Sequence, residues 1–222
     1  MKKRTIIAVV STIAVLAAAA GGVLALRNGS TVLADTSGDT PADVSGTASG
    51  TAEITPLAQQ ASVSAPTSDG LIYANEYRNS LYELTTGMSL FWENDATNLY
   101  VGLVSPGTGW AGVGFSNRTG KPGSNIILGA VSNGTVTIQD NYGVTKELHL
   151  VDRASSLLAI GGTETSGETT LEFVIPLASG DSQDVTLVPG QTVAVILAYQ
   201  ATKDSFTAEH TRYSQLQITL DP

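Results

Sequence analysis

Short runs of alternating apolar and polar residues follow one another along the chain from Asp69 onward. Such runs, separated by Gly, Asn, Asp and Ser, are typical of β-strands joined by turns. The expected strands are Met88–Asn94, Asn98–Val104, Gly109–Phe115, Asn125–Val131, Thr135–Tyr142, Glu147–Asp152, Leu157–Gly162, Thr169–Leu177, Gln191–Gln200 and Leu216–Leu220.

Turn chemistry supports the same interpretation. Ser132-Asn133-Gly134 separates two of the expected strands, and Asn-Gly readily adopts the positive φ angles of a tight hairpin turn. Beyond the N-terminal segment, no run shows a long apolar period of 3.6 residues. The pattern therefore predicts an all-β fold, an antiparallel sandwich of two sheets.

The N-terminal segment has a different pattern. Met1-Lys2-Lys3-Arg4 is followed by an uncharged run from Ile6 to Leu26, long enough to span a bilayer of about 30 Å. Small residues around Val32-Leu33-Ala34 would also suit cleavage of a signal peptide. Residues 1–34 are thus expected to form an export signal or a hydrophobic membrane-anchor helix, and both leave the rest of the protein outside the cytoplasm.

Residues 35–68 are rich in Ser, Thr, Ala, Gly, Pro and Asp and contain no aromatic residue. Such a segment cannot bury enough apolar surface to offset the entropy lost on ordering, so we expect a disordered linker. The expected organisation is a signal or anchor (1–34), a linker (35–68) and a β-sandwich domain (69–222).

Charge and composition exclude several classes of function. Four of the 11 basic residues precede residue 35, whereas all 20 acidic residues follow residue 34, which leaves a net charge of −13 on the exported part. Such a surface repels nucleic acid. There is no cysteine, and His149 and His210 are the only histidines. With no recognisable catalytic motif, the sequence indicates a binding module rather than an enzyme.

Several motifs, taken in order, resemble the DOMON family over about Asp69 to Leu220. They are DGLIYANEY (Asp69–Tyr77), the strand with Trp92, LYVGL (Leu99–Leu103), GWAGVGFS (Gly109–Ser116), GSNIILG (Gly123–Gly129), DNY (Asp140–Tyr142), FVIPL (Phe173–Leu177) with Gly180-Asp181, and VAVILAYQ (Val193–Gln200) followed by His210 and Arg212.

The resemblance implies an immunoglobulin-like β-sandwich that holds a ligand, either heme b or a sugar. It also implies that some members transfer electrons to redox partner proteins. In its heme-binding members a Met after the GW strand and a His near the last strand ligate the iron. His210 matches the histidine, and Arg212 and Trp110 belong to the same motifs.

The methionine position is where this chain departs from the family pattern, because Gly120-Lys121-Pro122-Gly123 stands there. The Lys121 amine is a candidate iron ligand, provided that it loses a proton whose ordinary pKa is about 10.4. Heme would need an apolar slot, which Ile126, Leu128, Val195 and Leu197 are expected to help line.

Several other residues can be interpreted in two ways. Alternation assigns His149 to solvent or a polar groove, opposite Leu148 and Leu150. Trp92, Trp110 and Phe115 are expected in the core, although outward rings would suit sugar binding. Asp181 and Asp184 could contribute to a calcium site, but two carboxylates supply fewer than the usual six to eight oxygens. The alternative to heme binding is a carbohydrate-binding or structural adhesion domain without a cofactor.

Overall fold

The structure is a computed structural model that describes residues 64–222, and these residues form two β-sheets and contain no helix. The strands are β1 (Asn79–Glu83), β2 (Met88–Asn94), β3 (Asn98–Pro106), β4 (Ala111–Ser116), β5 (Asn125–Ser132), β6 (Thr135–Gly143), β7 (His149–Val151), β8 (Ala159–Thr165), β9 (Glu168–Pro176), β10 (Thr192–Tyr199) and β11 (Arg212–Thr219).

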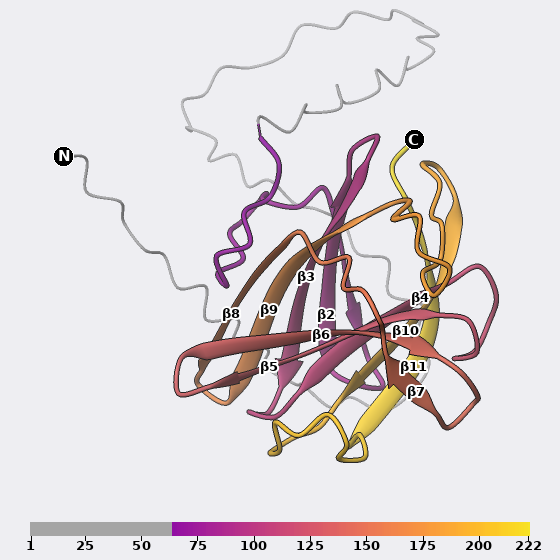
Figure 1. Cartoon of the computed structure of the whole chain (residues 1–222). Helices are drawn as coiled ribbons and strands as arrows, with labels where there is room; N and C mark the ends of the chain where they lie inside the picture. The colour runs from indigo at the N-terminus through magenta and orange to yellow at the C-terminus, as the bar shows by residue number, and fades with distance from the viewer. Residues whose placement is uncertain (1–63) are drawn as a thin grey trace, which may run out of the picture. The chain divides into compact units, whose positions relative to one another are not determined.

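The two sheets are antiparallel throughout. One has the order β1-β2-β3-β9-β8 and the other the order β11-β10-β4-β5-β6-β7. In Figure 1, β5 and β6 cross in front of β2, β3 and β9 at a steep angle, so the sheets lie face to face as two layers. The predicted all-β, two-sheet sandwich is confirmed. The expected N-terminal helix lies outside the described residues.

Apolar side chains on the inner faces of both sheets fill the space between them. The five-stranded sheet contributes Met88, Leu90, Leu103, Phe173 and Ile175, and the six-stranded sheet contributes Val113, Phe115, Ile127, Val195 and Leu197. All of these are buried. Because successive side chains of a strand point to opposite faces, the residues between these core positions lie on the outer faces of the two sheets.

The turns agree with the sequence where the signal was strong. Asn133 and Gly134 both have positive φ, 50° and 75°, as a two-residue hairpin turn between β5 and β6 requires. Ser166 and Gly167 form a similar turn between β8 and β9, with φ of 56° and 81°. No comparable sequence signal marks this second turn or strand β1.

The first described residues pack onto the edge of the five-stranded sheet. Pro66 is buried, and the Thr67 amide donates a hydrogen bond to Glu76 Oε1 at 3.1 Å. Gly70 has φ of +84°, and a Cβ there would lie only 2.6–2.8 Å from the backbone of Gly162 in β8. The ordered fold thus includes residues 64–68, which the composition had assigned to the linker.

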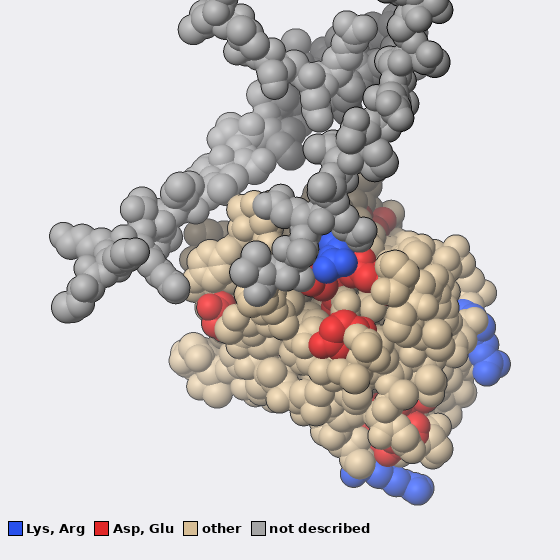
Figure 2. All heavy atoms as spheres, turned by 90° about the horizontal axis from the view of Figure 1, so that it is seen from above, with Lys and Arg blue, Asp and Glu red and all other residues tan. Residues whose placement is uncertain are grey.

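The expected signal or anchor and most of the expected linker lie outside the described residues. Within residues 64–222, nothing helical is available that could cross a membrane. Figure 2 shows one end of the sandwich, where uncharged side chains predominate, acidic ones occur in several places, and basic ones lie near the rim.

Candidate functional site

The outer face of the six-stranded sheet carries a large pocket whose floor consists of two rows of side chains. Cross-strand pairing aligns Leu128, Gly112, Ala198 and Tyr213 in one row across β5, β4, β10 and β11. It aligns Ile126, Gly114, Ile196 and Gln215 in the next row. All eight residues line the pocket, whose volume is about 780 Å³.

Two glycines make the floor deep. Gly112 and Gly114 lie at alternate positions of β4, the strand in the middle of both rows, so no side chain rises there. A Cβ on Gly112 would collide with Leu128 Cδ2, and one on Gly114 would lie 3.3 Å from Ile126 Cγ1. The apolar side chains beside these glycines therefore settle into the space that a larger residue would fill.

The segment between β10 and β11 forms one wall of the pocket, and Trp110 fixes it in place. The Trp110 amide donates to Lys203 O at 3.0 Å, its indole Nε1 donates to Ala208 O at 3.2 Å, and Gln200 N donates to Trp110 O at 2.8 Å. Trp110 itself is buried in a small outer cluster with Ile126, Leu128 and Ala130, against which Phe206 packs. The tryptophan of the Gly-Trp motif thus holds this wall in place through hydrogen bonds and packing.

His210 lies at the end of this wall and lines the pocket. Its ring is 4.9 Å from the ring of Tyr213, at an angle of 50°. The next residue, Thr211, donates its amide to Tyr199 O at 2.7 Å, which ties the segment to the end of β10. The imidazole is therefore carried by a segment that is anchored on both sides.

A second wall consists of the β4–β5 connection and the β6–β7 turn. The Ser124 amide donates to Lys121 O at 3.0 Å, and the Gly123 amide donates to Gly143 O at 2.8 Å. Gly143 permits this contact because a Cβ there would collide with Lys121 O. The Lys121 amine donates to Glu147 O at 3.1 Å. Lys121 is therefore held between the two segments.

His149 also lines the pocket, on the same side as Lys121. It pairs with Gly143 at the start of β7, and it is half-buried. Burial, together with the neighbouring Lys121 charge, lowers the pKa of His149 below its ordinary value of 6.5. Burial also lowers the pKa of Lys121, and the Glu147 carboxylate opposes this shift. At neutral pH the His149 imidazole is therefore mainly neutral, with a lone pair available to a metal.

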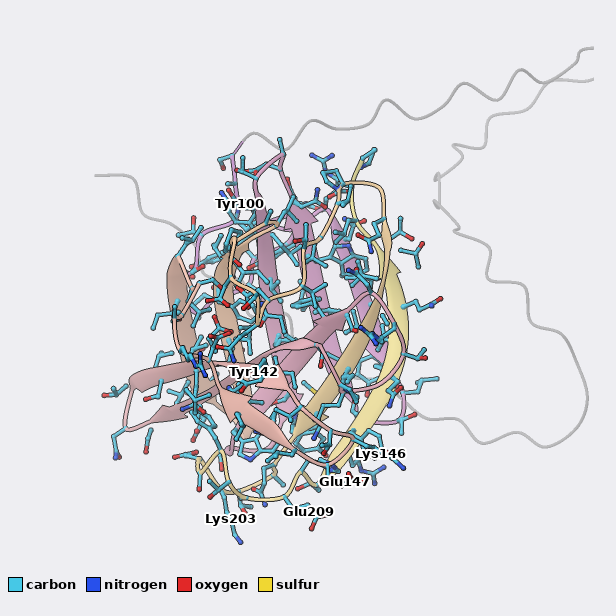
Figure 3. All side chains as sticks on the ribbon, turned by 45° about the vertical axis from the view of Figure 1, so that its right-hand side comes forward. Tyr100, Tyr142, Lys146, Glu147, Lys203 and Glu209 are labelled. Atoms are coloured by element: carbon cyan, nitrogen blue, oxygen red, sulfur yellow. The ribbon has the colours of Figure 1, made fainter. Side chains whose placement is uncertain are left out.

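The two walls stand at opposite ends of the strands that form the floor. The wall with His210 follows Tyr199, which pairs with Ala111 at the start of β4, whereas the wall with Lys121 follows Ser116 at its end. Lys146, Glu147 and Glu209 also line the pocket, and Figure 3 labels all three in the lower part of the sandwich. An apolar floor thus lies between nitrogen-bearing side chains at two ends, with His210 at one and Lys121 and His149 at the other.

The residues singled out in the sequence do not all meet here. His210, Lys121 and Trp110 line the pocket, as do Ile126 and Leu128. Arg212 does not, because its guanidinium donates to Thr85 O at 3.1 Å, on the connection between β1 and β2. Val195 and Leu197 were expected in the lining, but they belong to the core between the sheets.

Alternation in the sequence assigned His149 to solvent or a polar groove, opposite Leu148 and Leu150. In the structure these two leucines are each 45% exposed, and His149, the more buried of the three, lines the pocket. The sequence did not single out Tyr213 and Phe206, which line it too. The repeated glycine of GWAGVGF was the available signal, since alternate glycines in a strand mark a close approach or a hollow.

Comparison with known families supports the resemblance. Residues 84–200, more than half of the chain, match the DOMON domain. A human protein described as putative DBH-like monooxygenase protein 2 is 34% identical over 92 residues, which are 41% of this chain. The chain spans only 18% of that relative's length.

Two solved structures are similar to this chain, and the first of them shares its fold. The cytochrome b domain of pyranose dehydrogenase from Coprinopsis cinerea superposes with a TM-score of 0.51 at 12% identity, over 63% of this chain and 80% of that domain. The cytochrome domain of cellobiose dehydrogenase from Myriococcum thermophilum gives a TM-score of 0.45 at 12% identity, over 64% of this chain and 88% of that domain. At 12% identity the likeness to the first structure concerns the fold alone.

Proposed function

Because the chain belongs to the DOMON family, we propose that its pocket binds heme b and that His210 would hold the iron. DOMON domains are generally non-catalytic accessory modules that are extracellular or membrane-associated. The matching function here is a heme-binding module outside the cytoplasm. Such a module either carries heme or exchanges electrons with a partner protein.

One observation carries the proposal: an apolar pocket of about 780 Å³ has nitrogen ligands at both ends. The volume lies in the range of cofactor sites, roughly 300–1,000 Å³. The floor residues Ile126, Leu128, Ile196 and Ala198 suit a flat apolar ring. When bound, heme would supply redox-active iron, and the residues of this chain would bind it, orient it and keep water away.

The family methionine is absent, so the second ligand must come from elsewhere or be missing. His149 is the better candidate than Lys121, because it is mainly neutral at pH 7, whereas Lys121 must lose a proton and give up its hydrogen bond to Glu147 O. We propose His149 as the second ligand. Lys121, through its charge, then helps to keep that imidazole neutral.

The test is a titration of ferric heme into the full chain, followed by visible absorption of the oxidised and reduced forms. We expect a saturable shift of the Soret band. His210→Ala should weaken binding by more than about tenfold, since even the loss of an outer partner of a metal ligand commonly costs that much. A spectrum that stays that of free heme would show the proposal to be wrong.

Two further variants distinguish His149 from Lys121 as the second iron ligand. We expect His149→Ala to change the spectrum from six-coordinate to five-coordinate, and Lys121→Ala to leave it six-coordinate. Lys203→Ala removes the same charge outside the pocket lining and is the matched control for Lys121→Ala. The reverse result would make Lys121 the ligand.

Sugar binding is a second candidate, favoured by the Tyr213 ring. This ring is 52% exposed in a pocket that also holds Gln215 and Glu209, and exposed rings of this kind stack on sugar faces. Calorimetric titration with glucose and other simple sugars tests this function, with Tyr213→Ala as the variant. Tyr82→Ala, which changes an exposed tyrosine of the other sheet, is the control.

A further inference from the structure

Three aspartates that are distant in sequence meet on the other side of the six-stranded sheet. Asp140 lies in β6, Asp152 directly follows β7, and Asp184 lies between β9 and β10. One carboxylate oxygen from each lies within 4.8 Å of the other two. Asp140 pairs with Ile127, which faces the inner core, so this cluster and the heme pocket occupy opposite faces of the sheet.

Hydrogen bonds satisfy only part of this cluster. Asp140 Oδ2 accepts from the Ser156 amide at 2.8 Å and the Ser156 hydroxyl at 3.0 Å, and Asp152 Oδ1 accepts from the Ala154 amide at 3.2 Å. Asp140 Oδ1, Asp152 Oδ2 and both carboxylate oxygens of Asp184 are buried and accept no hydrogen bond. Asp140 and Asp152 are more than nine-tenths buried. Four acceptor atoms are therefore shielded from bulk water and left without a donor.

No side-chain cation compensates these carboxylates. Within residues 64–222, Arg78 and Glu93 form the one ion pair, and it lies elsewhere in the sandwich. Unpaired buried charges cost several kcal/mol each, so a chain that gathers three of them benefits from a positive ligand between them.

We propose that Asp140, Asp152 and Asp184 form a structural calcium site. The donors are carboxylate oxygens without any nitrogen or sulfur, which favours a hard cation. The four unpartnered oxygens supply about half of the six to eight that calcium takes, and backbone carbonyls and water can complete the shell. Magnesium fits less well, because it demands a nearly regular octahedron, whereas these donors come from three unrelated segments.

The test measures thermal unfolding and calorimetric binding with the full chain after removal of metal by a chelator. Calcium chloride up to about 5 mM exceeds the roughly 0.1–1 mM at which extracellular calcium modules bind. We expect a saturable rise of the melting temperature and a matching heat of binding. Magnesium chloride at the same concentrations should give a clearly smaller rise. No rise with calcium, or an equal rise with both ions, would overturn the proposal.

Asp184→Asn is the decisive variant, since the Asp184 side chain makes no hydrogen bond that folding could lose. We expect it to abolish the response to calcium while it keeps the metal-free melting temperature or raises it. Asp204→Asn removes the same charge from the exposed segment before β11 and should respond like the wild type. Undiminished calcium binding by Asp184→Asn would also overturn the proposal. Heme binding, on the opposite face of the sheet, should be unchanged in Asp184→Asn.

Discussion

Two of the places where this sandwich buries carboxylates treat them in opposite ways. Glu172 in β9 is fully buried and accepts hydrogen bonds from the amides of Gly70 and Leu71 at 2.7 and 3.1 Å and from the Tyr77 hydroxyl at 2.8 Å. The cluster of Asp140, Asp152 and Asp184 leaves four oxygens without any donor. Burial alone therefore does not decide the role of a carboxylate.

This difference in hydrogen bonding distinguishes Glu172, a structural carboxylate, from the three aspartates, which we propose as ligands. All donors to Glu172 come from the segment that leads into the domain, so its charge holds residues 70–77 against the five-stranded sheet. The chain itself supplies the hydrogen-bond donors that Glu172 needs. The aspartate cluster is complete only when something positive joins it, which is why the calcium proposal rests on that region and not on Glu172.

The largest effect should come from Glu172→Ala. The substitution leaves the Tyr77 hydroxyl and two backbone amides without an acceptor, and each such group costs about 1–3 kcal/mol. We expect the free energy of unfolding to fall by about 3–5 kcal/mol, measured by chemical denaturation. Glu168→Ala, at an exposed position of the same strand, should change it by less than about 0.5 kcal/mol. A loss below about 1 kcal/mol at Glu172 would remove the contrast between the two regions.

Asp152→Asn should have an effect of the opposite sign in metal-free buffer. The amide oxygen can keep the hydrogen bond from Ala154 N, while its NH₂ group can donate to the unpartnered oxygens of Asp140 and Asp184. We expect the free energy of unfolding to rise by about 1 kcal/mol, the usual worth of a hydrogen bond together with the loss of a like charge. With saturating calcium the wild type should become the more stable protein. A loss of stability without metal would contradict this account of the cluster.

The smallest effect should come from Glu172→Gln, which can retain all three contacts because the Tyr77 hydroxyl can also accept a hydrogen bond. We expect a loss below about 1 kcal/mol at pH 7. Burial raises the pKa of Glu172 above its ordinary value. A raised pKa means that the folded state binds the proton more tightly than the unfolded state does, so this contribution is present at low pH and is lost as the pH rises through the folded pKa.

The same pair of proteins measures that titration. Between about pH 4 and pH 8, the stability of the wild type should fall relative to Glu172→Gln as the pH rises, because only the wild type can ionise there. Denaturation midpoints at four or five pH values give the difference. Parallel curves would show that burial does not perturb the ionisation of Glu172.

Local patterns predicted the fold well because strand alternation and turn residues act over a few positions. Met88–Asn94 has the expected bounds, and Asn133-Gly134 makes the expected turn. The pocket was harder to predict. In QTVAVILAYQ both faces of the strand are apolar, so the sequence could not tell that Val195 and Leu197 face the core while Ile196 and Ala198 face the pocket.

Contacts between segments that are distant along the chain determine the positions of His149 and of the three aspartates. His149 is near Lys121 because Gly143 admits the β4–β5 connection, a contact between segments that no local pattern reveals. Asp184 was recognised as a candidate calcium ligand, but its partners in the structure are Asp140 and Asp152 rather than Asp181. Asp181 and Asp184 alone would supply too few carboxylates for calcium. The further proposed ligands come from segments that are distant along the chain.

The origin of the three aspartates has a mechanical consequence. Asp140 and Asp152 belong to the six-stranded sheet and its exit, whereas Asp184 lies on the connection that leads from the five-stranded sheet into β10. A cation between them cross-links two layers of a protein that has no cysteine with which to form a disulfide. Unlike a disulfide, this cross-link is indifferent to reductants and opens when calcium is withdrawn. Resistance of the domain to proteases would then depend on the ionic content of its surroundings.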